Sequence, residues 1–223
     1  IFNTNCQVLV NTVNCEGIMG KGMALESKYR FPEMYDNYKD SCSTGQLKPG
    51  MLILWQKSTP WILNFPTKIH WKNDSKIEYI SQGLDKFISI YKSKNITSIA
   101  FPMLGASLGG LQENIVEDVM IKYLKKIEEK IEIEIYKYDK NATDDLYDKF
   151  VDMTHGYGVN DYKLNLKITT IAAQNLHDVI KNKKNKSMLG LQDIEQVGNK
   201  AIEKIHIFIN KEKKGIQENL SFE

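Results

Sequence analysis

The chain has 223 residues, of which 42% are hydrophobic and 26% are charged, a composition typical of globular proteins. It excludes intrinsic disorder, collagen-like repeats and small disulfide scaffolds. The formal net charge of +2 excludes a whole-protein electrostatic field that would by itself force a nucleic-acid or membrane partner. At about 100–200 residues per domain, this length predicts one large domain with a smaller appendage.

An alternation of strands and helices is predicted for the first part of the chain. Residues 7–13 are rich in β-branched residues and predict a buried strand, and the Phe31-Pro32 step separates two predicted helices, the first of which begins near Ala24. The later elements are strands at 51–56 and 61–65, a helix at 77–94, a strand at 97–102, a helix at 114–130 and a strand at 131–138. This order predicts an α/β fold with a largely parallel sheet, helices on both faces and a ligand at the carboxyl ends of the strands.

After Asp139 the pattern contains helices only. They are predicted at about 142–153, 162–182 and 190–211, which places a domain boundary near residue 140. The three cysteines are odd in number and have no C-x-x-C spacing, which favours reduced thiols in a cytoplasmic protein. Neither a signal peptide nor an apolar run of the ~18 residues needed to span a bilayer is visible, so no membrane partner is expected.

Two glycine-rich loops each lie between a predicted strand and a predicted helix. Asn14–Gly22 holds three glycines in six residues, and the second loop is Gly105–Gly110. Glycines let a backbone approach a ligand closely and present N–H groups to a phosphate. Neither loop has the G-x-G-x-x-G or G-x-x-x-x-G-K-[ST] spacing, so a dinucleotide fold or a nucleoside triphosphatase is not supported. Two loops that clamp a diphosphate remain, and the alternative is a pair of tight turns without a ligand.

The residues of these loops carry a family resemblance. Val10–Ala24 resembles the ADP-ribose loop of macrodomains, and Phe101–Leu111 resembles their phosphate loop. Asn64–Trp71, together with the Met-Gly-Lys-Gly form of the first loop, is similar to the DarG antitoxin subgroup, which is related to terminal ADP-ribose protein glycohydrolase. The resemblance implies a three-layer α/β/α macrodomain with a mostly parallel mixed sheet at 1–139. A small all-α region would occupy 140–223.

The resemblance also implies a ligand and a set of site residues. Asn14 would hydrogen-bond the distal ribose of ADP-ribose, Ser107, Leu108 and Gly109 would give backbone N–H groups to the diphosphate, and Tyr138 would stack near the adenine. The implied ADP-ribose-binding residues are Asn14, Gly17, Ile18, Met19, Gly20, Lys21, Gly22, Gly105, Ala106, Ser107, Leu108, Gly109 and Tyr138. No cofactor is implied. Because the chain begins at Ile1, directly before a strand, we expect the family's first strand to be missing and adenine to be held more weakly.

Lys68 is the catalytic residue that the resemblance implies. Cleavage of an ADP-ribosyl bond makes an electron-poor anomeric carbon, which a lysine at the edge of the site could attack or assist by proton transfer. Such a nucleophile must be partly neutral, which requires desolvation or a nearby positive charge such as Lys21. The alternative for Lys68 is an exposed surface lysine. Protein-directed relatives carry an acidic residue where this chain has Gly109, so a lysine-aspartate pair is not expected.

The function implied by the resemblance is removal of ADP-ribose from nucleobases in DNA, which would reverse a cognate ADP-ribosyltransferase toxin. His70 and Trp71 could contact the nucleobase, or Trp71 could simply pack at the rim. The alternatives are a non-catalytic ADP-ribose reader and a hydrolase of protein-linked ADP-ribose or O-acetyl-ADP-ribose. His155, His177 and His206 have no metal-ligand spacing, so no metal is expected.

The C-terminal region carries a weaker resemblance. Leu191–Ile205 resembles half of a helix-hairpin-helix unit, although Gln196 stands where the first glycine of its turn is usual. Four lysines lie upstream and could contact DNA phosphates: Lys181, Lys183, Lys184 and Lys186. The alternative is a solvated linker and an ordinary helical hairpin.

Overall fold

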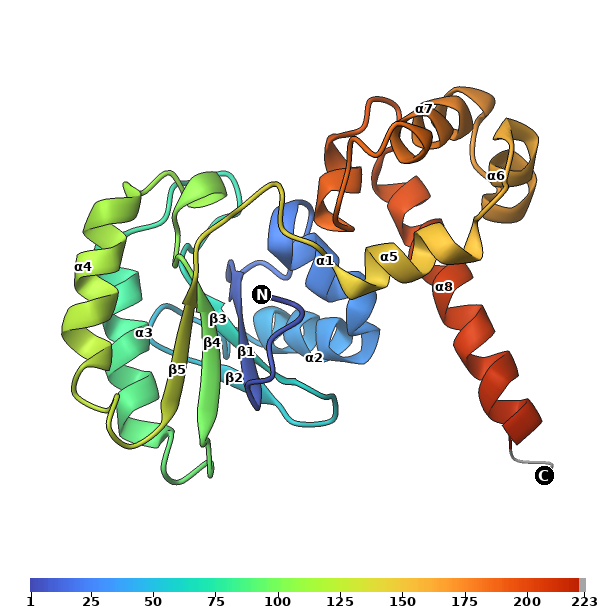
Figure 1. Ribbon diagram of the computed structural model, residues 1–223. Helices are drawn as coiled ribbons and strands as arrows, with labels where there is room; N and C mark the ends of the chain where they lie inside the picture. Colours follow the sequence, from blue (N-terminus) through green and yellow to red (C-terminus); the bar gives the residue numbers. More distant parts are fainter. Residues whose placement is uncertain (221–223) are drawn as a thin grey trace. The chain divides into compact units, whose positions relative to one another are not determined.

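The computed structural model describes the backbone of residues 1–220 and the side chains of residues 1–211. The chain divides into two compact units, Ile1–Tyr138 (unit 1) and Asp139–Glu223 (unit 2) (Figure 1). The division therefore falls between Tyr138 and Asp139. Unit 1 contains the sheet and both glycine-rich loops, and unit 2 is helical wherever it is regular.

The sheet of unit 1 has five strands in the order β2-β3-β1-β4-β5. Four of them run parallel: β1 (Val8–Val13), β3 (Trp61–Pro66), β4 (Ser98–Pro102) and β5 (Glu132–Tyr136). The short strand β2 (Ile53–Trp55) is antiparallel to β3. The sheet is thus mixed and mostly parallel, as predicted.

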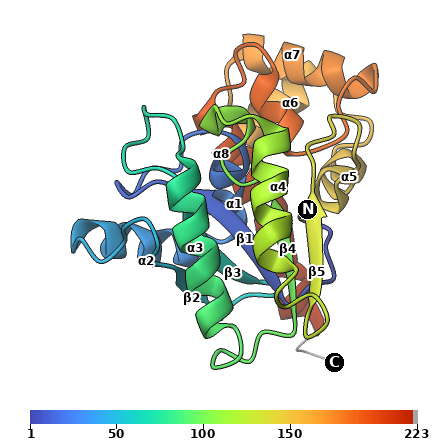
Figure 2. The same ribbon diagram turned by 90° about the vertical axis from the view of Figure 1, so that its left-hand side faces the viewer.

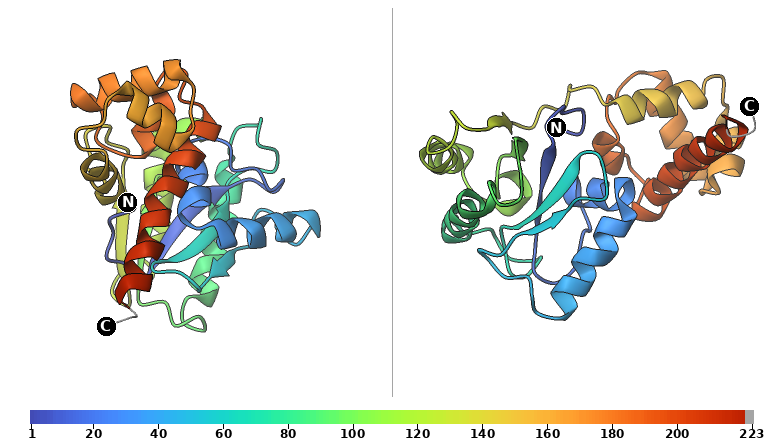
Figure 3. Two further views of the ribbon diagram at one scale, coloured as in Figure 1. Left: turned by 90° about the vertical axis from the view of Figure 1, so that its right-hand side faces the viewer. Right: turned by 90° about the horizontal axis from the view of Figure 1, so that it is seen from below.

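Helices cover both faces of this sheet (Figures 2 and 3). On one face, α3 (Ile77–Ile90) and α4 (Glu113–Leu124) enclose a core with Val8, Val10 and Phe101. On the other, α1 (Gly22–Arg30) and α2 (Pro32–Ser43) pack over the alternate residues of β1. β1 is apolar almost throughout because a strand covered on both faces has no solvent side. The predicted three-layer α/β/α architecture is confirmed.

Two helices of unit 1 end earlier than predicted. The helix α4 ends at Leu124, and residues 125–130 form turns in which the amides of residues 126, 127 and 130 bond three residues back, as Ile127 does to the Leu124 carbonyl at 2.9 Å. The helix α3 ends at Ile90, after which Asn95 takes a φ of +55° and turns the chain toward β4. Apolar spacing alone does not reveal these ends, because both turns keep burying apolar side chains.

Unit 2 contains α5 (Asp145–Met153), α6 (Val159–Leu166), α7 (Thr170–Lys181), a 3-10 turn η2 (Leu189–Asp193) and α8 (Asn199–Leu220). Within its described residues no strand occurs. Asp144 caps α5 by accepting a hydrogen bond from the Leu146 amide at 3.0 Å.

Two single helices predicted in unit 2 are each broken in the structure. The predicted helix 162–182 is wrong because Lys167 takes a φ of +53° and Thr169 starts a new helix by accepting a hydrogen bond from the Ala172 amide at 3.2 Å. The predicted helix 190–211 is wrong because Gln196 takes a φ of +63°, so that α8 begins only at Asn199. Left-handed residues interrupt a helix without interrupting its apolar pattern.

Candidate functional site

The candidate site lies where four parallel strands end. β1, β3, β4 and β5 are in parallel register, with Val13 opposite Pro66 and Pro102 opposite Tyr136. The chain that follows each strand must therefore emerge at the same edge of the sheet. These four segments are the first glycine-rich loop, the segment with Lys68, the second glycine-rich loop and Tyr138.

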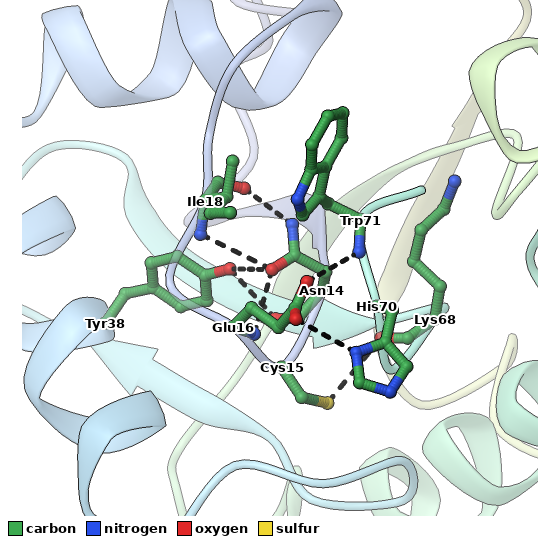
Figure 4. A network of polar contacts seen from close by, with 8 residues as sticks. All are labelled: Asn14, Cys15, Glu16, Ile18, Tyr38, Lys68, His70 and Trp71. Carbon is green, nitrogen blue, oxygen red and sulfur yellow. Dashed lines mark hydrogen bonds and ion pairs between the residues drawn. The ribbon is translucent and has the colours of Figure 1, made fainter. Parts of the chain in front are cut away.

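Asn14 organises the first loop from inside (Figure 4). Its Nδ2 donates to the Ile18 carbonyl at 2.6 Å, and its Oδ1 accepts from the Glu16 amide at 2.9 Å. Tyr38 of α2 donates its hydroxyl to the Asn14 carbonyl at 2.9 Å and to Oδ1 at 3.1 Å. Burial raises the pKa of the Tyr38 phenol, so the hydroxyl stays a donor. The structure thus gives Asn14 a role in shaping the loop, and its contact with a ribose stays a prediction.

The second loop is wound into a tight turn. Gly105 and Gly110 take φ values of +70° and +79°, and Ser107 takes +52°. The Gly109 amide donates to the Ala106 carbonyl at 3.0 Å, so this predicted phosphate donor is used within the loop. Hydrogen bonds within the loop thus help to fix its shape.

Leu108 brings the two loops together. A Cβ atom placed on Gly22, which has a φ of +62°, would lie 2.7 Å from Leu108 Cδ1. Lys68 also reaches the second loop, because its Nζ donates to the Leu108 carbonyl at 3.1 Å. The glycine at position 22 therefore serves the close approach of the loops as well as the backbone turn.

The segment from Thr67 to Lys76 packs on the second loop. The Ser75 amide donates to the Gly109 carbonyl at 2.8 Å, and the Ser75 hydroxyl donates to Thr67 Oγ1 at 3.2 Å. A Cβ atom at Gly109 would lie 2.6 Å from Ser75 Oγ. Ser75 thus occupies the space that an acidic side chain at position 109 would need.

Lys68, His70 and Trp71 lie next to the first loop, as Figure 4 shows. The Cys15 amide donates to the Ile69 carbonyl at 3.0 Å. The Glu16 carboxylate contacts His70 Nδ1 at 2.9 Å and accepts from the Trp71 amide at 3.0 Å. The hydrogen bond from His70 holds the pKa of Glu16 below its usual range. The Trp71 side chain stays half exposed.

Comparison with known proteins agrees with this geometry. Residues 10–120 match the family model of the Macro domain. The macrodomain of Mycobacterium tuberculosis DarG is 37% identical, with a TM-score of 0.59 over 62% of this chain and 93% of that one. The chain belongs to the macrodomain family. Its resemblance to DarG macrodomains is confirmed, since that of Thermus aquaticus DarG is 36% identical with a TM-score of 0.58 over 61% of this chain and 92% of that one.

Longer relatives carry informative names. A "DNA ADP-ribosyl transferase-DNA ADP-ribosyl glycohydrolase fusion protein" of Thermosipho africanus is 37% identical over 61% of this chain and 39% of its own length. A "DNA ADP-ribosyl glycohydrolase" of Mycobacterium bovis is 40% identical over 57% of this chain and 37% of its own length. The chain therefore spans about two fifths of the length of the curated relatives that it matches.

The other predicted site residues of this macrodomain differ in burial. Met19 is buried, and its Sδ lies 3.9 Å from Asn11 Nδ2, whereas Ile18 and Leu108 are exposed at the two loops. Lys21 is exposed just before α1. Tyr138 follows β5 and is 63% exposed, and its contact with an adenine stays a prediction.

Three residues that organise the macrodomain site were missed from the sequence: Glu16, Tyr38 and Ser75. Tyr38 lies on the buried face of α2, where a tyrosine in an apolar helix pattern gives no separate signal of its hydroxyl. Glu16 and Ser75 make contacts with residues 70, 71 and 109, which are distant in sequence. The one signal in the sequence was the acidic Glu16 inside a glycine-rich loop, because a negative charge beside an expected anion site indicates a role other than binding the anion.

Unit 2 holds none of the predicted ADP-ribose-binding residues. Its lysines at 181, 183, 184 and 186 are exposed, and a cavity of about 400 Å³ is lined by residues that include Asp178, Lys184 and Asp193. Gln196 has a left-handed backbone conformation, which glycine would favour at the corresponding position in the turn of a helix-hairpin-helix unit. The helix-hairpin-helix resemblance stays a prediction. Within residues 1–211, no three His, Cys, Asp or Glu side chains gather as metal ligands, and no described helix could cross a membrane.

Proposed function

We propose that this macrodomain removes ADP-ribose from ADP-ribosylated nucleobases in DNA and that Lys68 is its catalytic residue. One observation carries the proposal: Lys68 lies between the two loops that would hold ADP-ribose, with its Nζ 3.1 Å from the Leu108 carbonyl. The names of relatives at 37–40% identity support DNA as the carrier of the modification.

The reaction is a hydrolysis at the anomeric carbon. The bond from this carbon to the base breaks, a water supplies the hydroxyl that replaces the base, and the base takes up a proton. Lys68 can serve this chemistry by attacking the anomeric carbon or by moving a proton at the leaving base. The loops supply orientation, because backbone donors and a helix start favour the negative diphosphate.

The rim beside Lys68 suits a base. Trp71 is half exposed, and Lys72 places its Nζ 5.3 Å from the centre of the indole ring. Stacking on an aromatic ring and contact with a nearby cation are general means of holding a nucleobase and its phosphate. We therefore assign the base-binding role to Trp71 and the neighbouring His70.

A cognate ADP-ribosyltransferase toxin is the proposed biological counterpart. The Thermosipho africanus relative is named as a fusion of a DNA ADP-ribosyl transferase and a glycohydrolase, which places opposing activities in one protein there. A solved structure of Thermosipho africanus DarTG in complex with ADP-ribose is 38% identical, with a TM-score of 0.59 over 65% of this chain and 41% of that one. ADP-ribose is accordingly the ligand that we propose for the two loops.

The test is release of ADP-ribose from a single-stranded ADP-ribosylated oligonucleotide by the wild type, Lys68→Ala and the control Lys94→Ala. Lys94 lies in the turn before β4, at the opposite edge of the sheet. We expect release by the wild type and the control, and no measurable release by Lys68→Ala, which should still bind ADP-ribose in calorimetry.

The outcomes separate the alternatives. Binding of ADP-ribose without release from any substrate would make the protein a reader. Release from modified protein or O-acetyl-ADP-ribose but not from DNA would change the substrate class. Equal release by Lys68→Ala would remove Lys68 from the reaction.

A further inference from the structure

The segment that carries Lys68 has no regular secondary structure of its own. β3 ends at Pro66, α3 begins at Ile77, and Lys68–Trp71 lies between them as bends and turns. Repetitive backbone bonding therefore does not fix its position. Lys68 and the Trp71 ring extend away from the Glu16–His70 contact in Figure 4, and between them the Ile69 carbonyl accepts a backbone hydrogen bond from Cys15.

Glu16 makes two side-chain contacts that hold this segment to the first loop, beside the Cys15 thiol, whose Sγ lies 3.6 Å from the Lys68 carbonyl. One oxygen, Oε1, lies 2.9 Å from His70 Nδ1, and the other, Oε2, accepts from the Trp71 amide at 3.0 Å. Both carboxylate oxygens are thus committed to the two residues that follow Ile69. Hydrogen bonds to a charged carboxylate are stronger than those between neutral groups.

Glu16 is itself held by the loop. Its amide donates to Asn14 Oδ1, and Asn14 is tied in turn to Tyr38 of α2. The chain of contacts runs from a buried helix residue through Asn14 and Glu16 to the rim. These hydrogen bonds fix the position of Glu16, so that its carboxylate can hold a segment that has no regular secondary structure.

We propose that Glu16 is a positioning residue, which holds the Lys68–Trp71 segment against the first loop and so places the Lys68 ammonium and the Trp71 ring at the site. The proposal rests on the proposed function for its consequence in catalysis. Its structural part, the hold of Glu16 on the Trp71 amide, can be measured without any turnover.

The charge of Glu16 gives the hold a defined pH dependence. His70, the Trp71 amide and Lys72 all favour the ionised carboxylate, and Cys15 is the other titratable group beside it. Because the pKa of Glu16 is lowered, its carboxylate is fully ionised, and the contact is complete, at every pH above the usual pKa range of a glutamate. It weakens as the pH falls through that lowered pKa, when the carboxyl loses its charge and the charge-assisted hydrogen bonds become neutral ones.

The experiment compares Glu16→Ala and Glu16→Gln with the control Glu128→Ala, an exposed glutamate in the turn after α4. Hydrogen exchange of the Trp71 amide, measured by NMR in the full chain, reports the contact directly. Affinity for free ADP-ribose and the kcat and KM for release from modified DNA report the site. The wild-type exchange is followed from neutral to acid pH, with protection corrected for the intrinsic rate.

For Glu16→Ala we expect the Trp71 amide to exchange about tenfold faster and kcat to fall about tenfold, since small misplacements of a reacting group are costly. ADP-ribose affinity should change less than about threefold, because the loop residues that would bind it are retained. Glu16→Gln should restore most of the protection, because its amide oxygen can still accept from Trp71, and should remove the acid dependence. Glu128→Ala should match the wild type.

Unchanged exchange of the Trp71 amide in Glu16→Ala would overturn the proposal. Faster exchange with an unchanged kcat would overturn its catalytic part, because Lys68 would then be placed by other contacts. A wild type that releases no ADP-ribose would refute the proposed function alone, and the exchange measurement would still decide the role of Glu16.

Discussion

Replacement of Gly109 by alanine tests how the second loop and the Lys68 segment fit together. A Cβ atom at this position would lie 2.6 Å from Ser75 Oγ and 3.3 Å from Ser75 Cβ. Gly109 is buried, and its φ is not in the left-handed region, so the effect is one of space and not of backbone strain. Overpacking of a filled interior costs about 1–3 kcal/mol, and we expect Gly109→Ala to destabilise unit 1 by this amount.

The matched control lies in the other loop. A Cβ atom at Gly20 would meet Ile18 Cγ2 at 3.7 Å, an ordinary contact, so Gly20→Ala should leave stability within about 0.5 kcal/mol of the wild type. Urea unfolding followed by tryptophan fluorescence measures both. Trp55, Trp61 and Trp71 all lie in unit 1, so the signal reports this unit without a contribution from unit 2.

A second substitution identifies the cause. Ser75→Ala removes Oγ, so the shortest contact of the new side chain at position 109 lengthens from 2.6 Å to 3.3 Å. In this background Gly109→Ala should cost less than about 1 kcal/mol, which gives a favourable coupling in a double-mutant cycle. An equal cost in both backgrounds, or a cost for Gly109→Ala no larger than that for Gly20→Ala, would refute the reasoning. By the same argument, Gly109→Asp should be tolerated worse than Gly109→Ala.

Three further predictions concern other parts of the chain. Tyr38→Phe should lower the unfolding free energy by about 1–2 kcal/mol and weaken ADP-ribose binding, because the buried hydroxyl holds Asn14. Burial raises the pKa of the Cys15 thiol to about 11, so at pH 8.5 its alkylation, followed by mass spectrometry, should be about a hundredfold slower in the native protein than in urea. Serine at positions 181, 183, 184 and 186 should weaken the binding of unmodified DNA and flatten its salt dependence in gel-shift assays.

Each of these has a result that would count against it. Wild-type stability and affinity in Tyr38→Phe would mean that Asn14 keeps its place without the hydroxyl. Equal alkylation of Cys15 in both conditions would show that the thiol is accessible and ionised. If the salt dependence of DNA binding is unchanged after the lysine substitutions, these four lysines do not bind DNA and are an ordinary solvated surface of unit 2.

The amino-acid sequence by itself determined the layers and the place of the site. Apolar strands that alternate with amphipathic helices require a covered, mostly parallel sheet, and loops that follow parallel strands must meet at one edge. The two glycine-rich loops could therefore be assigned to that edge from local pattern and strand direction alone, whereas Lys68 was assigned to the site through the family resemblance of its segment.

Tertiary structure alone decided which side chains hold these segments in place. The contact of Glu16 with the Trp71 amide joins residues 55 positions apart, and Ser75 excludes a side chain at Gly109 across 34 positions. The helix breaks at Lys167 and Gln196 were likewise hidden, because a left-handed residue that is not glycine leaves no mark in the apolar pattern. The hydrophobic pattern of a sequence indicates which residues are buried, whereas these features depend on which residues the fold brings into contact.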